Sequence, residues 1–142
     1  FNKSRSSIKD KGELMKKLEY IFSLINSIFA YLFGGIDTLI TTLIIFIVLD
    51  YITGVCKGIY RKELNSKKGL KGIIKKIGYL FIIILASLFD KITNNTDGTI
   101  RTITIYFFIS NEAISILENW ALMDLPLPKK LLNVFKNLTE GK

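Results

Sequence analysis

Histidine is absent from this 142-residue chain, and cysteine occurs once, at Cys56. Because no imidazole is present, histidine-based acid–base catalysis is excluded. A single cysteine cannot form a disulfide framework within the chain or a cluster of zinc ligands. No other nucleophile–base pair is evident in the sequence. We therefore predict a protein that is not an enzyme, with no catalytic residue, no metal and no cofactor.

Uninterrupted apolar runs of membrane length are also missing, because no segment has eighteen consecutive uncharged residues. Even so, 49% of the residues are hydrophobic, and they are clustered rather than spread. The clusters lie at about residues 20–33, 36–56, 73–92 and 102–123. A domain of residues 18–125 is therefore predicted to be an all-α integral membrane protein with three to four transmembrane helices. Between the last two clusters, the two acids and two bases of residues 90–101 cancel, and Asn94, Asn95 and Gly98 predict a short turn on the outer face.

A strongly basic segment separates the second and third apolar clusters. It carries +7 of the chain's net charge of +8, because Glu63 is its only acid. Its basic residues are Lys57, Arg61, Lys62, Lys67, Lys68, Lys71, Lys75 and Lys76. Short basic loops between apolar helices stay on the cytoplasmic side of a membrane. We expect this loop to attract anionic lipid, with Lys75 and Lys76 snorkelling to the interface, and we expect no nucleic-acid partner because no groove-reading motif accompanies it.

The N-terminal segment, residues 1–17, reads as a polar basic tail with a net charge of +4. Residues 20–33 follow as a charge-free apolar segment that ends at Gly34-Gly35. If the tail and the basic loop are both cytoplasmic, the number of crossings between them must be even. This favours four spans with the glycine pair as the outer turn. The alternative is three spans, with residues 20–33 lying on the membrane surface.

The C-terminal segment, residues 126–142, is predicted to be a cytoplasmic amphipathic tail. Pro126 and Pro128 are expected to stop the fourth helix. Beyond them, one face gathers apolar residues and the other gathers lysines, which is typical of a helix resting on the inner leaflet. The apolar residues are Leu131, Leu132, Phe135 and Leu138.

Polar residues inside the apolar clusters are the candidate functional residues. Acids at the centre of a membrane helix cost about 2.5–3.5 kcal/mol each when ionised, so they need partners or water. Asp50 lies near the end of the second cluster. The fourth carries a stripe of Thr104, Asn111, Ser115 and Glu118, flanked by Glu112 and Asn119. Such a stripe either seals against another helix by hydrogen bonds or faces water in a pore.

Glycines flank the basic loop on both sides. Gly54 and Gly58 form a small-xxx-small pair, which permits close helix packing but equally suits a flexible exit from the membrane. Gly69 and Gly72, which follow Asn65-Ser66 among lysines, are also predicted to be helix-packing positions. Because no strand precedes them and the Walker spacing is absent, Ser66 is predicted to be a helix N-cap rather than part of a phosphate-binding loop.

The order of these features resembles the phage-lysis and toxin-secretion holin family, including the clostridial toxin-release holins. The matching features run from Asp50-x-x-x-Gly54 through Arg61-Lys62, Asn65-Ser66, Gly69-x-x-Gly72, Lys75-Lys76 and Asp90 to Asn111-Glu112, Ser115-Ile116, Glu118-Asn119 and Pro126-x-Pro128. They cover roughly residues 38–138. The chain departs from the family at Met123-Asp124-Leu125, where a glycine is common before the prolines.

The resemblance implies a small protein of the bacterial inner membrane that forms a homo-oligomer and permeabilises the membrane. An endolysin, which is a wall hydrolase, or a large toxin would then leave the cell as cargo. Two alternatives remain open. One is a non-conducting scaffold or accessory subunit, and the other is a selective ion channel with a ring of Glu112 or Glu118. Release of a cytoplasmic reporter protein distinguishes the three.

Overall fold

The computed structural model describes residues 2–128 and 130, and the part that it describes is helical without strands. The helices are α1 (Asn2–Phe33), α2 (Thr38–Tyr60), α3 (Ser66–Ile92) and α4 (Thr99–Ala121). Of these, α2, α3 and α4 are long and apolar enough to cross a membrane. The predicted all-α membrane architecture is confirmed, with three candidate spans. The expected apolar face at residues 131–138 lies outside the described residues.

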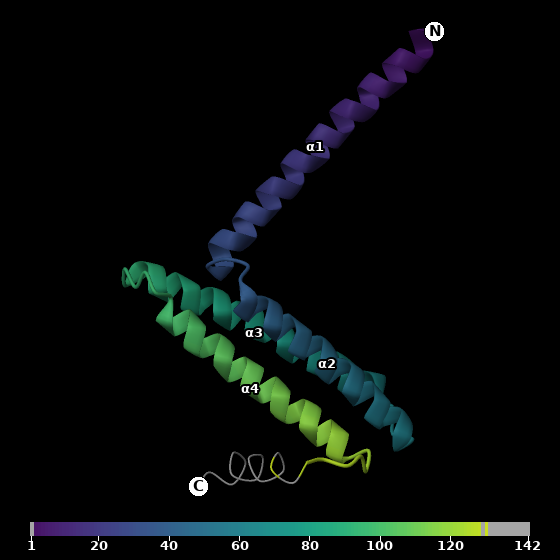
Figure 1. Cartoon of the computed structure of the whole chain (residues 1–142), viewed down its shortest axis with the longest axis vertical. Coiled ribbons are helices and arrows are strands. Elements are labelled where there is room, and N and C mark those ends of the chain that lie inside the picture. Colours follow the sequence, from purple (N-terminus) through teal and green to yellow (C-terminus); the bar gives the residue numbers. More distant parts are fainter. Residues whose placement is uncertain (1, 129, 131–142) are drawn as a thin grey trace.

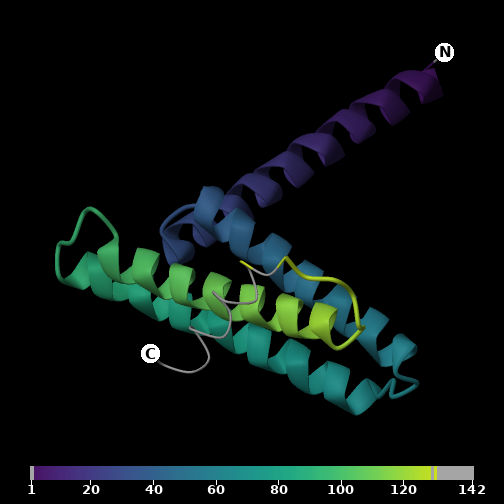
Figure 2. The same ribbon diagram turned by 60° about the horizontal axis from the view of Figure 1, so that its bottom comes forward.

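Helices α2, α3 and α4 form a bundle in which consecutive helices run in opposite directions (Figure 1). Helix α4 packs most extensively against α2 and also against α3, whereas α2 and α3 touch each other little. Figure 2 shows the three helices side by side along most of their length. Helix α4 is therefore the element that joins the bundle.

The buried apolar core is small and lies toward the glycine-pair end of the bundle. Tyr79 and Phe108 stack within it, with ring centroids 4.1 Å apart. Most other large apolar side chains point outward, as Ile45, Phe81 and Phe107 do. So much exposed apolar surface suits lipid rather than water as the surrounding solvent. The core residues are Phe33, Ile40, Leu43, Ile83, Ile105 and Phe108.

Helix α1 leaves the bundle and points away from it in both views (Figures 1 and 2). It is not among the candidate spans. Its contact with the bundle lies at its C-terminal end, where Phe33 is buried and the Lys91 ammonium sits 3.7 Å above the Tyr31 ring. The helix begins at Asn2, so the segment predicted to be a polar tail is continuous with the apolar segment of residues 20–33.

Two turns fall where the sequence predicted them. Gly34 and Gly35 have φ values of 72° and 117°, in the left-handed region that favours glycine. A Cβ on Gly34 would lie 2.9 Å from side-chain atoms of both Arg101 and Ser87, so the position needs glycine for space as well. The turn between α3 and α4 contains Asn94 (φ 52°) and Gly98 (φ 62°).

The basic loop is shorter than predicted. Only residues 61–65 are non-helical, because α2 continues to Tyr60 and α3 begins at Ser66 rather than near residue 73. The N-cap of α3 is Asn65, not Ser66 as predicted. The Asn65 side chain accepts hydrogen bonds from the backbone N–H groups of Lys67 (2.9 Å) and Lys68 (3.3 Å), which stabilise the first turn. The charge of the segment is therefore carried mostly on helices.

Candidate functional site

A lysine–carboxylate cluster joins the three helices of the bundle. Lys76 of α3 donates hydrogen bonds to Asp50 Oδ2 of α2 at 2.6 Å and to Glu112 Oε2 of α4. It also reaches the carbonyl oxygen of Ile47 at 3.4 Å. Glu112 is 3% exposed, so its carboxylate depends on this lysine for compensation. One ammonium group thus ties α3 to both of the other spans.

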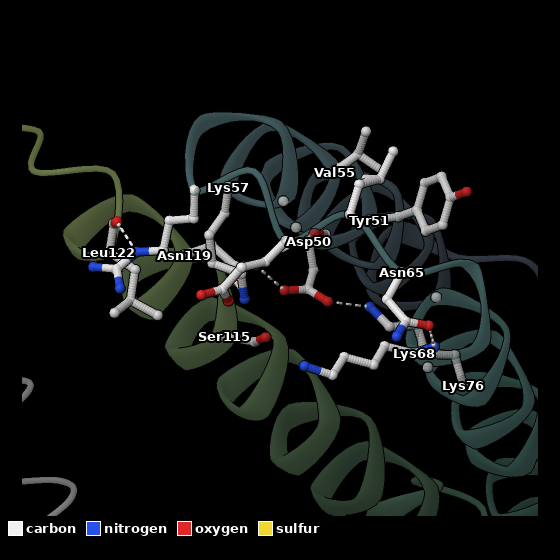
Figure 3. Close-up of a pocket in the computed structure, with 17 residues that line it drawn as sticks. Asp50, Tyr51, Val55, Lys57, Asn65, Lys68, Lys76, Ser115, Asn119 and Leu122 are labelled. Carbon is white, nitrogen blue, oxygen red and sulfur yellow. Dashed lines mark hydrogen bonds and ion pairs between the residues drawn. The ribbon is translucent and has the colours of Figure 1, made fainter.

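Asn119 of α4 extends this cluster toward the basic loop (Figure 3). Its Nδ2 group donates to Asp50 Oδ1 at 3.0 Å and to Thr53 Oγ1 at 3.2 Å. Its Oδ1 atom accepts a hydrogen bond from Lys57 Nζ at 2.6 Å. The polar network therefore consists of Asp50, Thr53, Lys57, Lys76, Glu112 and Asn119.

The network holds two carboxylates and two ammonium groups, so its charges balance within one chain. Among the described residues, no buried side-chain nitrogen or oxygen lacks a hydrogen-bond partner. Charged groups at membrane depth are tolerated when they are paired in this way. The prediction that Lys76 snorkels to the interface was wrong, because its ammonium points inward between Asp50 and Glu112.

The structure separates the residues of the predicted α4 stripe. Glu112 and Asn119, predicted only to flank the stripe, lie seven residues apart on the buried face. Ser115 lies between them and lines a cavity, whereas Asn111 is half-buried. The Thr104 hydroxyl donates to the carbonyl oxygen of Ile100 in its own helix. Glu118 is exposed on the outside of the bundle.

The predicted packing glycines occupy different surroundings. A Cβ on Gly54 would lie 3.6 Å from Asn119 Nδ2, which places this glycine against α4 of the same chain. A Cβ on Gly58 would lie 3.0 Å from the Leu64 side chain. Gly69 and Gly72 have no such neighbour within 4 Å, and all four glycines line one cavity.

We expect Gly54→Leu to destabilise the bundle by about 1–3 kcal/mol, because the added side chain would push Asn119 out of the network. Gly54→Ala should be close to neutral, since its Cβ makes an ordinary contact. Unfolding by SDS in mixed micelles, followed by circular dichroism, measures both. Gly78→Leu is the matched control because no atom lies near its Cβ. Equal stability of the two leucine variants would contradict this role for Gly54.

A second polar cluster holds the opposite end of the bundle. Arg101 of α4 bonds the Asp37 carboxylate at 2.7 Å, the Gly35 carbonyl oxygen at 3.0 Å and the carbonyl oxygen of Phe33. The Arg101 hydrogen bond lowers the pKa of the Asp37 carboxyl, despite partial burial. Asp37 in turn caps α2 by accepting from the N–H of Ile40 at 3.0 Å. Arg101 therefore fixes the α1–α2 turn to α4.

Asp90 completes this cluster by capping α4. Its carboxylate accepts from the N–H groups of Ile100 (3.1 Å) and Arg101 (2.8 Å) and from Asn95 Nδ2 (2.8 Å). A carboxylate at the N-terminus of a helix also interacts favourably with the helix dipole. The sequence did not single out Arg101, because its charge was counted within a loop whose charges cancel. The available signal was that Asp90 and Arg101 lie on either side of a predicted turn, which can bring an acid and a base together.

We expect Arg101→Lys to destabilise the chain by about 1.5–3 kcal/mol, because one ammonium cannot reproduce three separately directed hydrogen bonds. SDS unfolding is again the measurement. The loss should diminish as the pH falls below the ordinary Asp37 pKa of 3.8, since protonation removes the same ion pair in the wild type. Lys91→Arg is the control, and equal stability of Arg101→Lys and wild type would refute the anchoring role.

Comparison with known proteins places these features in context. A sequence model of the bacteriophage holin family matches residues 27–140. An uncharacterized 14.9 kDa protein of Clostridium perfringens is 43% identical over 83% of this chain and 89% of its own length. An uncharacterized protein of Listeria monocytogenes is 45% identical over 76% of each chain. A probable holin of Bacillus phage phi105 is 36% identical over 70% of this chain and 72% of its own. No solved structure matches.

Proposed function

Since the chain belongs to the bacteriophage holin family, we propose that it oligomerises in the bacterial cytoplasmic membrane and makes that membrane permeable to proteins. The cargo would be a wall hydrolase or a large toxin. The observation that carries the proposal is the family match over residues 27–140, which includes all three candidate spans. The balanced polar network supports it, because each chain could enter lipid without an uncompensated buried charge.

The outer surface of α4 supports an assembly that contains water. Glu118 is exposed there, and so is Ser110, on a helix that is otherwise apolar enough to span. A carboxylate facing lipid is costly, whereas one facing a water-filled lumen or a neighbouring chain is not. If several copies assembled with this face toward a shared lumen, Glu118 would leave the lipid. The free energy gained would favour association. The buried face of α4, which carries Glu112 and Asn119, would keep its contacts with α2 and α3 within each subunit.

Release of cytoplasmic reporters tests the proposal. The chain is expressed in a bacterium that contains a small fluorescent protein and a larger enzyme, and both are measured outside the cells together with a permeant dye. A holin should release the proteins as well as the dye. Passage of ions or dye without protein would indicate a selective channel instead, and no passage of any of them would indicate a scaffold.

We expect residues 61–65 and the C-terminal end of α4 to be cytoplasmic, because the basic residues gather there. A cysteine at Ser66 in a Cys56→Ser background should resist a membrane-impermeant thiol reagent in intact cells, whereas one at Thr96 should be labelled. Labelling at Ser66 together with protection at Thr96 would reverse this orientation. Labelling of a cysteine at Ser4 then gives the number of spans. Protection means that α1 crosses the membrane, for four spans, and labelling means that it does not, for three.

A further inference from the structure

A cavity of about 380 Å³ opens at the basic end of the bundle, between α2, the 61–65 loop, α3 and α4. This volume falls within the range of roughly 300–1,000 Å³ that is usual for small-molecule sites. Four of its lining residues are basic, namely Lys57, Arg61, Lys68 and Lys76. Figure 3 shows Lys68 extended between α3 and α4. Asp50 and Glu63 are the acidic residues in the lining, so the cavity is net positive.

Three of these cations form no ion pair within the described residues. Ion pairs there join Lys76 to Asp50 and Glu112, and Arg101 to Asp37, but none includes Lys57, Arg61 or Lys68. Lys57 bonds a neutral amide oxygen, and Arg61 Nε donates to the carbonyl oxygen of Leu122 at 2.8 Å. These acceptors are neutral, so they orient the two groups without pairing either one with a carboxylate. The cavity therefore has the electrostatics of an anion site.

An apolar groove of about 370 Å³ adjoins the cavity, and both share Tyr51 and Lys76 in their linings. The groove lies between α2 and α3, the two spans that touch each other least. On α2 it extends from Tyr51 to Ile44, which is roughly 10 Å along the helix axis. Its other lining residues are Ile47, Val48, Ile73, Ile77 and Leu80.

We propose that the cavity and the groove together bind one anionic phospholipid. The headgroup phosphate lies in the cavity against Lys57, Arg61 and Lys68, and an acyl chain lies in the groove. The cationic cavity suits the phosphate of such a lipid, and the apolar groove suits its acyl chain. The cavity also lies where the apolar segments end, at the level of headgroups. A free phosphate would not use the groove, and a helix of a second copy would not use the three cations. The inference rests on membrane insertion and not on pore formation.

Lipid retention by the full-length chain tests the headgroup half. Native mass spectrometry in detergent compares phosphatidylglycerol with phosphatidylcholine of identical acyl chains. Wild type should retain one phosphatidylglycerol with at least about tenfold preference, and Arg61→Gln/Lys68→Gln should lose that preference. Lys67→Gln/Lys71→Gln removes equal charge outside the cavity and should keep it. Arg61→Lys/Lys68→Arg should keep it as well, which separates charge from folding. Equal loss in both glutamine pairs would overturn the site in favour of diffuse surface attraction.

Filling the groove tests the acyl half. Val48→Trp should weaken phosphatidylglycerol retention severalfold, whereas Ile45→Trp, on the exposed surface outside the groove, should not. Glycerol 3-phosphate, which has the headgroup chemistry without the chains, should compete only weakly with the lipid. If it competes equally well and Val48→Trp changes nothing, the cavity binds a free anion and the lipid proposal fails. If cysteines at Val48 and Ile77 crosslink two chains with lipid present, a second copy occupies the groove and the proposal fails likewise.

Discussion

Lys76→Met is expected to destabilise the bundle by about 3–5 kcal/mol, the usual cost of leaving buried charge without its partner. The lysine compensates two carboxylates at once, one from α2 and one from α4. Its loss would leave Glu112, which is 3% exposed, without a cation and would remove the link between α3 and both other spans. SDS unfolding and the yield of protein in the membrane fraction measure the effect, and reporter release should fall with them.

Lys75→Met is the matched control, because Lys75 is exposed one residue away. The triple variant Asp50→Asn/Lys76→Met/Glu112→Gln supplies the rescue, since neutralising all three charges removes the penalty of unpaired ones. We expect it to recover most of the lost stability. If Lys76→Met is as stable as Lys75→Met, or if the triple variant is less stable than the single one, the carboxylates are not held as the structure indicates.

The overall fold was predictable because the relevant signals are local. Apolar clusters of membrane length located α2, α3 and α4, and the pairs Gly34-Gly35 and Asn94-Asn95 located two turns. The start of α3 was placed too late because lysines were counted as loop. Helix propensity tolerates lysine well, and Asn65 supplied an N-cap that lies one residue before the predicted one. The lysines therefore indicate where the chain leaves the membrane, but they do not indicate where α3 begins.

The candidate site was only partly predictable because it depends on contacts between helices. Polar residues on α4 were identified, but the buried face proved to be centred on Glu112 and Asn119, about 80° around the helix from the predicted centre. Periodicity along one helix cannot say which of two adjacent polar faces meets a neighbour. Lys76 was assigned to the membrane interface because its partner Asp50 is 26 residues away in sequence. A buried pairing of this kind becomes visible only when α2 and α3 are placed together.

Glu118→Leu is expected to reduce reporter release by at least about tenfold while leaving the fold and the oligomer intact, because a dry lumen favours closure. Glu118 is exposed on α4, outside the polar network, so an apolar replacement should not disturb the subunit. Glu118→Gln keeps a polar surface and should release normally. Glu112→Leu serves as the contrast, since it should impair folding first. Oligomer size, membrane yield and release are measured on the same preparations.

The comparison between these variants separates the two roles of a polar α4. If the exposed face only joined chains by hydrogen bonds, Glu118→Leu would reduce oligomer size and release in parallel, and Glu118→Gln would leave both unchanged. If it lines water, release is lost while the oligomer persists. Glu19→Leu, the same change on α1 outside the three candidate spans, should behave as wild type. Wild-type oligomer size and release for Glu118→Leu would contradict both roles, and the search for the permeabilising surface would move to α2 and α3.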